Sequence, residues 1–178
     1  MTVPPYSVAF VLTLTVAVLS ERYRLRAPFI MATSSLAAVG YIFLLSAPKA
    51  LPGLSYFGTI LAAAGIYPST AIVLAWPANN VSGQTKRATA NAMQISIGNL
   101  GAVLGTQLYR PKMASRFFVG HGMALAYLVA NVGVVGTQWW ILSQENKRRD
   151  GIAEAAEIED IEGTEWKGDD DERWRFQT

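Results

Sequence analysis

The chain has 178 residues, of which 51% are hydrophobic and 16% charged, and its mean hydropathy of +0.24 is high for a soluble domain. It has no cysteine and a single histidine, His121, which excludes disulfides, a thiol nucleophile and zinc sites built from cysteines or several histidines. The net charge of +2 averages a basic body, in which Glu21 is the only acid before Glu145, and a tail from Asp150 onward with eleven acids and three bases. The basic residues lie between apolar runs, which argues against nucleic-acid binding.

Five stretches are long and apolar enough to cross a bilayer as helices. About 20 apolar residues span the roughly 30 Å of hydrocarbon, and lipid offers no partner for free backbone groups. We place transmembrane helices at about residues 3–20, 27–47, 55–77, 88–109 and 122–143. The second has no polar stripe, which argues against a soluble helical bundle. The sequence predicts an all-α membrane protein, with a transmembrane bundle over residues 1–146 and an acidic tail over 147–178.

Lysines and arginines in the short loops predict the orientation, because they favour the cytoplasmic side. Alternate loops carry eight of these residues on one side and four on the other. The richer set is Arg22, Arg24, Arg26, Lys86, Arg87, Lys147, Arg148 and Arg149. We therefore expect a multi-pass plasma-membrane protein with a cytoplasmic tail. The first helix then starts at the outer face, which suggests that a preceding helix is missing.

A proline and a tyrosine stand together inside the third predicted helix. Pro68 cannot donate to the carbonyl four residues back, so we expect a kink there. Tyr67 beside it has two interpretations: it faces a cavity and donates to an anionic ligand, or it is an ordinary packed tyrosine.

The fourth predicted helix is the most polar. Asn91 and Gln94 are three residues apart and share one face of the helix. Asn99 lies one residue beyond the position that continues this face. Polar groups are costly in hydrocarbon, so these amides are candidates to bind a carboxylate or ureide ligand. The alternative is helix packing, since Gly101 and Gly105 have the spacing of a small-residue contact.

Catalytic and cofactor-binding patterns are absent from the sequence. No acidic residue lies inside a predicted span, and no Ser-His-Asp or paired-carboxylate arrangement occurs. We therefore expect no enzyme, no cofactor and no metal site. The tail holds too few apolar residues for a core and is predicted to be disordered. It is either simply solvated or a regulatory or sorting segment.

The first loop resembles a turn of the major facilitator transporters. The stretch Ser20-Glu21-Arg22-Tyr23-Arg24-Leu25-Arg26 is similar to the turn between the second and third helices of each half of those proteins. There an acid and arginines cross-link helix ends at the cytoplasmic face and bias the inward/outward equilibrium. The resemblance implies this gating role for Glu21, Arg22 and Arg26, although the family usually has Asp where Glu21 stands. A plain topogenic loop is the alternative. Lys86 and Arg87 are expected to be topogenic and to contact the same gate.

Later stretches are similar to the fungal allantoate permease family, which are anion:cation symporters of the major facilitator superfamily. Gly65 to Pro68, Trp76 to Arg87 and Gly98 to Gly101 resemble the tenth and eleventh helices of that family. Thr2 to Tyr6 resembles the start of the eighth helix, Gly120-His121 the entry to the twelfth, and Trp174 to Phe176 the end of the tail. Met113-Ala114-Ser115 departs from the acid and proline that often precede the twelfth helix.

The resemblance covers nearly the whole chain and implies helices 8–12, an incomplete C-terminal half of a major facilitator fold. Such transporters bind substrate between two halves, so we expect this chain alone to transport nothing. In the intact parent, the resemblance implies proton-coupled uptake of a small organic anion such as allantoate or a vitamin. The proton carrier would lie in the missing portion or at Glu21. A separate N-terminal half is a further expected partner, besides the lipid bilayer. The alternative function is a non-transporting assembly or regulatory partner of another transporter chain.

Overall fold

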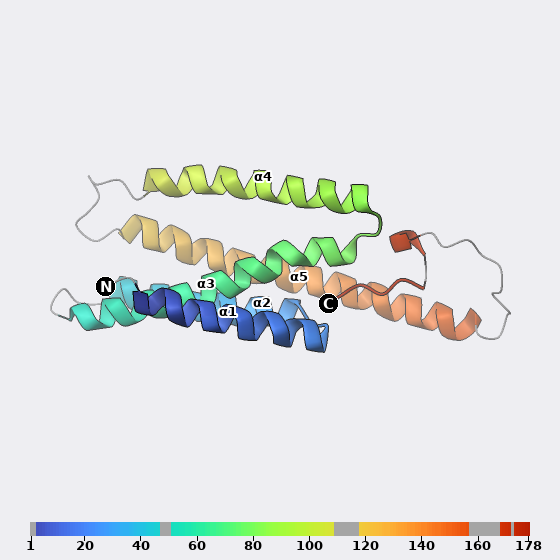
Figure 1. Ribbon diagram of the computed structural model, residues 1–178, viewed down its shortest axis with the longest axis horizontal. Helices are drawn as coiled ribbons and strands as arrows, with labels where there is room; N and C mark the ends of the chain where they lie inside the picture. Colours follow the sequence, from blue (N-terminus) through green and yellow to red (C-terminus); the bar gives the residue numbers. More distant parts are fainter. Residues whose placement is uncertain (1–2, 47–50, 109–117, 157–167, 172) are drawn as a thin grey trace.

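The computed structural model describes residues 3–46, 51–108, 118–156, 168–171 and 173–178. Within these residues the chain forms five long helices and one short 3-10 helix, and no strand. The elements are α1 (Val3–Tyr23), α2 (Ala27–Ser46), α3 (Pro52–Asn80), α4 (Gln84–Leu108), α5 (Phe118–Ala156) and η2 (Gly168–Asp170). Figure 1 shows the long helices lying along a common direction. The predicted all-α membrane fold with five helices is confirmed.

Four of these helices are long and apolar enough to cross a membrane, namely α1, α2, α3 and α5. The fourth helix that the sequence predicts as a span, α4, is not among them. Its amides, glycines and threonines lower its hydropathy below that of the others.

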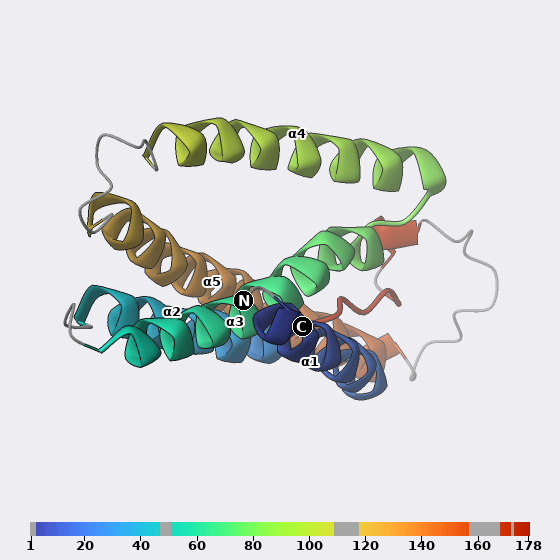
Figure 2. The same cartoon turned by 60° about the vertical axis from the view of Figure 1, so that its left-hand side comes forward.

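The core joins four of the helices. Buried apolar residues from α1, α2, α3 and α5 form one cluster, made of Val16, Ala27, Ile30, Ile72, Trp76 and Val135. Helix α4 contributes none of these residues, and Figure 2 shows it standing apart from the other four. The chain thus forms a four-helix bundle with α4 at its side.

Helices α2 and α3 approach closely because glycines lie where they meet. A Cβ built on Gly65 would lie 2.5 Å from the Ala37 nitrogen and 2.5 Å from the Thr33 oxygen. A Cβ built on Gly40 would lie 2.5 Å from the Ala62 nitrogen. Only hydrogen fits in such spaces, so the two backbones are in direct contact, as small residues allow in membrane proteins.

Helix α3 is longer than the predicted 55–77 at both ends. Pro52 lies in its first turn, where the missing amide hydrogen costs nothing. Pro68 and Pro77 both lie inside the helix, which continues to Asn80. Figure 1 shows the second part of α3 rising away from α1 toward α4. Gly83, with φ of +85°, then turns the chain into α4.

Helix α5 extends well past the predicted end at residue 143, as far as Ala156, so it crosses the expected boundary between bundle and tail. Glu145 explains part of this extension, because it forms ion pairs with Arg148 at 2.7 Å and Arg149 at 2.8 Å on the next turn. The expected disorder of the tail also differs from the structure, in which residues 147–156 are helical and residues 168–171 and 173–178 pack on the bundle. Residues 157–167 lie outside the described residues.

Three positively charged segments lie at one end of the bundle, which we call the basic end. They are the α1–α2 turn with Arg22, Arg24 and Arg26, the start of α4 with Lys86 and Arg87, and the α5 segment with Lys147, Arg148 and Arg149. Figure 1 shows all three segments toward the right-hand side. The sequence predicts these same residues to share one side of the membrane. The opposing set, Lys49, Arg110, Lys112 and Arg116, lies outside the described residues.

Candidate functional site

The structure separates the three candidate amides that the sequence predicts on α4, Asn91, Gln94 and Asn99. Gln94 is partly buried and its Nε2 donates to the Val73 carbonyl of α3 at 2.9 Å. Asn91, one turn earlier, is also partly buried, whereas Asn99 is exposed. The buried Asn91 Oδ1 and Gln94 Oε1 accept no hydrogen bond from the residues that the structure describes. A buried acceptor without a donor costs about 1–3 kcal/mol, so these two oxygens are candidates to receive a ligand's N–H or O–H group.

The glycines of α4 make no close contact with the described part of the chain. A Cβ built on Gly98, Gly101 or Gly105 would meet nothing within 4 Å among the described residues. The packing contact between α3 and α4 that the structure does show is the hydrogen bond from Gln94. Gly101 and Gly105 therefore do not act as a small-residue contact within this part of the chain.

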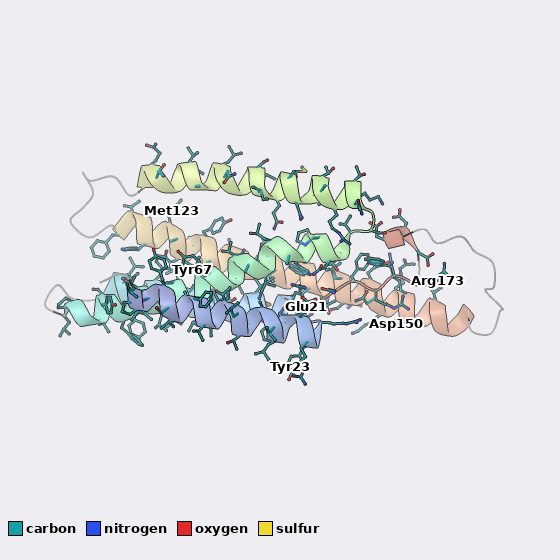
Figure 3. All side chains as sticks on the ribbon, in the orientation of Figure 1. Glu21, Tyr23, Tyr67, Met123, Asp150 and Arg173 are labelled. Carbon is teal, nitrogen blue, oxygen red and sulfur yellow. The ribbon has the colours of Figure 1, made fainter. Side chains whose placement is uncertain are left out.

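Tyr67 lies on α3 beside the buried Pro68 and is 47% exposed. Its ring meets that of Tyr6 on α1 edge-on, with centroids 5.9 Å apart. Figure 3 shows Tyr67 in the body of the bundle, away from Asp150 and Arg173 at the basic end. The side chain is thus neither enclosed in the core nor free of neighbours.

A buried polar cluster in the bundle was missed by the sequence analysis. The Ser34 hydroxyl of α2 lies 2.9 Å from the Ser69 hydroxyl of α3 and donates to Asn131 Oδ1 of α5 at 3.3 Å. Asn131 is an amide inside the fifth predicted span, and this signal was available in the sequence. The two serines give no such signal, because serine is common in membrane helices that pack through small residues.

The predicted gating residues divide into paired and exposed ones. Arg26 is buried, and its Nη2 donates to Glu21 Oε2 at 2.9 Å across the α1–α2 turn. Arg24 closes this turn with φ of +54°, a conformation that few residues other than glycine adopt. Arg22 and Arg87 are exposed. The acid and arginine pair that the sequence singles out is therefore formed by Glu21 and Arg26.

The end of the tail lies across the basic end of the bundle. We call residues 174–178 the strap. Asn80 of α3 donates to the Gln177 carbonyl at 3.1 Å and accepts from the Gln177 amide at 2.7 Å. Asn146 of α5 does the same with Phe176, at 2.9 Å and 3.0 Å. Two asparagines on different helices thus hold consecutive residues of the strap by their backbone.

The strap also contacts α3 and the α1–α2 turn through single groups. Trp76 Nε1 of α3 donates to the Gln177 carbonyl at 2.8 Å. Arg26 donates through its backbone nitrogen to the Thr178 carbonyl at 2.7 Å and through Nε to Gln177 Oε1 at 2.9 Å. The contact of Trp76 joins residues far apart in the chain, and nothing in the sequence indicates it.

Arg149 is the main charged contact between α5 and the tail. Its Nη1 donates to the Asp171 carbonyl at 2.8 Å and to the Trp174 carbonyl at 3.2 Å. Its guanidinium lies over the Phe176 ring, 4.6 Å from the centroid, in a cation–π contact. An ion pair also joins Arg175 of the strap to Asp150 of α5 at 2.6 Å.

A hollow of about 380 Å³ lies beside the strap. It is lined by Arg24, Asn79, Arg173, Trp174, Arg175, Phe176 and Gln177. Two of its arginines are neutralised, since Arg173 pairs with Asp171 at 2.8 Å and Arg175 with Asp150. Within the described residues, no group of three His, Asp or Glu side chains is placed to hold a metal ion.

The Lys86–Asp169 contact predicts how the tail responds to acid. The hydrogen bond and charge of Lys86, 3.1 Å away, hold the pKa of the Asp169 carboxyl below its ordinary value. A lowered pKa means that the contact is complete above the ordinary value of about 4 and is lost as pH falls through the lower one. A spin label on Thr178→Cys should keep constant mobility from about pH 5 to 9 and become more mobile below about pH 4. Lys86→Met should raise the mobility at neutral pH and reduce the acid response. A mobility that changes instead between about pH 5 and 9 would contradict the assignment to Asp169.

Comparison with known proteins shows similarity to fungal transporters. The chain is 34% identical over 173 residues to an MFS-type transporter of Penicillium expansum, covering 95% of this chain and 33% of that protein. It is 31% identical over 153 residues to a major facilitator-type transporter of Emericella nidulans, covering 84% and 30%. It is 28% identical over 152 residues to the high-affinity nicotinic acid transporter of Saccharomyces cerevisiae, covering 85% and 28%. No family model and no solved structure matches the chain. The chain spans about a third of the length of these relatives.

Proposed function

Because the chain corresponds to about a third of several transporters of the major facilitator type, we propose that it forms one wall of a transport cavity for a small organic anion. The resemblance to allantoate permeases assigns it to helices 8–12, within the C-terminal half of such a transporter. The cavity would be completed by the remainder of the transporter, encoded with this chain or as a separate N-terminal half. By the positive-inside rule, the basic end would face the cytoplasm.

The observation that carries this proposal is the pair of buried amide oxygens on α4. Asn91 Oδ1 and Gln94 Oε1 have no donor among the described residues, and a substrate with N–H groups would satisfy both. Allantoate has such ureide N–H groups as well as a carboxylate. Asn99 and Tyr67 are exposed in this chain, so both would line the same cavity and donate to a carboxylate, Tyr67 from beside Tyr6. A small carboxylate with N–H groups is the substrate class that fits these four side chains.

The proposed gate is built from the Glu21–Arg26 pair at the α1–α2 turn and from Lys86 at the start of α4. Glu21 is exposed and Arg26 is buried, so the pair connects the surface to the start of α2. The carrier for the proposed proton coupling of the intact parent would lie in the rest of the transporter or at Glu21.

Large apolar side chains on α4 support the need for further helices. Exposed residues of this kind on α4 are Met93, Ile95, Ile97, Leu100, Val103 and Leu104. In water the exposure of these side chains would cost about 25 cal/mol per Å², so lipid or other transporter helices must cover them.

The alternative function is that of a non-transporting partner of another transporter chain. Co-purification of a companion chain, without transport by the complex, would favour this alternative.

Uptake by the complete transporter tests the substrate class. Cells that express the transporter carrying this sequence should take up labelled allantoate, and Gln94→Leu should lower the rate at least about tenfold, the equivalent of about 1.4 kcal/mol. Loss of the amide removes both the substrate contact and the bond to Val73, so surface expression is measured in parallel. Ser96→Ala, two positions along α4 and exposed, serves as the control. If the complete transporter takes up no carboxylate, the proposed substrate class is wrong; if Gln94→Leu is as active as the parent, Gln94 does not bind substrate.

A further inference from the structure

The second part of α3 has a weakened ladder of backbone hydrogen bonds and is also bound by the tail. Pro68 and Pro77 interrupt the hydrogen-bond ladder of α3, so the segment that follows Pro68, residues 69–80, bends more readily than an unbroken helix. This segment holds Trp76 and Asn80, which are also the α3 residues that bind the strap. We propose that the strap is a lock on this segment of α3, which bends only when the strap has left.

The contacts explain why the docked strap would hold the segment still. Asn80 of α3 and Asn146 of α5 each make two bonds to the strap backbone, so the strap ties the end of α3 to α5. The bonds from Arg26 tie the same strap residues to the α1–α2 turn. Three separate parts of the basic end are thus joined through residues 176–178. Movement of any one part against the others must break these bonds.

The same contacts explain why the strap can leave. Its attachment depends mainly on hydrogen bonds and on the ion pair between Arg175 and Asp150, in which Asp150 is exposed. Each such hydrogen bond is worth about fivefold in an equilibrium constant, because water replaces the partner that is lost. The strap buries no large apolar anchor in the core cluster of the bundle. A few broken bonds are therefore enough to release it.

The consequence for function rests on the proposed transport activity. A transporter opens and closes its cavity by moving helices against one another, and the end of α3 lies at the basic end where the proposed gate is placed. A docked strap would keep this end closed. Release of the strap would then be the regulated step, and the tail would act as an internal inhibitor of transport.

Docking and α3 mobility are measured without transport, on the full chain in membranes. Because the chain has no cysteine, Thr178→Cys is the only site for a maleimide-linked polymer. The double substitution Asn146→Ala and Phe176→Ala should speed attachment of the polymer at position 178 at least tenfold. The same two substitutions should raise the rate of amide hydrogen exchange at least tenfold in residues 76–80 of α3 and leave the rate in residues 54–66 unchanged. Lys147→Ala, an exposed neighbour on α5, should change neither rate. Equal modification rates in the double variant and the parent would overturn docking, and unchanged exchange in residues 76–80 would overturn the lock.

The effect of the strap on transport is tested with a reversible cross-link in the complete transporter. Asn146→Cys and Phe176→Cys are joined by a cleavable bifunctional thiol reagent, and uptake should fall at least tenfold and recover when the link is cleaved. Each single cysteine variant, treated identically, should keep its uptake. Full uptake by the cross-linked protein would overturn the inhibitory role and leave the transport proposal intact. A parent that transports no organic anion would sink the transport proposal, while polymer modification and exchange still decide the lock.

Discussion

Gly65→Leu should prevent the bundle from folding. A Cβ at this position would lie 2.5 Å from two backbone atoms of α2, and backbone cannot move aside as a flexible side chain can. Overpacking a core costs about 1–3 kcal/mol when neighbouring side chains adjust, so we expect a cost above about 3 kcal/mol here. The measurement is the yield of monodisperse protein in detergent and its thermal unfolding.

Gly101→Leu is the matched control for this substitution. It makes the same change on α4, where a new Cβ meets nothing within 4 Å of the described residues. We expect nearly unchanged yield and melting temperature. Equal losses in the two variants would show that α2 and α3 are not in backbone contact, and would contradict the packing described above.

Arg149→Met should detach the tail from the bundle. The Arg149 side chain is only 9% exposed, and its loss removes the bonds to the Asp171 and Trp174 carbonyls and the contact with the Phe176 ring. Hydrogen bonds to charged groups contribute about 1.5–3 kcal/mol each, so we expect docking to weaken by about 3 kcal/mol or more. Limited proteolysis should then cut the tail much faster, while the helical content of the bundle stays the same.

Arg148→Met provides the comparison within the same helix turn. Arg148 is 56% exposed and forms an ion pair with Glu145, a type of surface contact worth about 0–1 kcal/mol. Its loss should leave the rate of tail cleavage within about twofold of the parent. A tail that is cut equally fast in both variants would mean that general loss of charge, and not the specific contacts of Arg149, weakens docking.

Hydropathy predicted the helices because each span must satisfy its own backbone in lipid, a requirement that is local in sequence. Hydropathy does not report helix ends beyond the lipid, where ion pairs on successive turns such as Glu145–Arg149 continue α5 past residue 143. The tail shows the same limit more strongly. A count of apolar residues predicts disorder, but the strap uses polar partners in the bundle, Asn80 and Asn146. No local pattern reports such long-range pairs.

Small-residue spacing was informative about the mode of packing but not about its position. The four-residue spacing of Gly101 and Gly105 drew attention to α4, whereas the glycines in contact are Gly40, Gly58 and Gly65. The difference depends on the facing helix, since α2 presents Ala37 and Gly40 to α3. In the candidate site, the sequence singled out the amides Asn91 and Gln94, which the structure shows to be partly buried. It did not distinguish them from Asn99, because exposure depends on the crossing of α3 and α4.

Helix α5 has 39 residues, which at 1.5 Å per residue corresponds to about 58 Å. A bilayer with its headgroups is about 40–45 Å thick, so α5 is longer than the membrane is thick. If the span ends near residue 143, Arg149 lies about 9 Å farther along the helix axis, near the outer edge of the headgroup layer. The attachment point of the strap is therefore at the water boundary, within reach of soluble proteases, kinases and binding proteins that never enter the lipid.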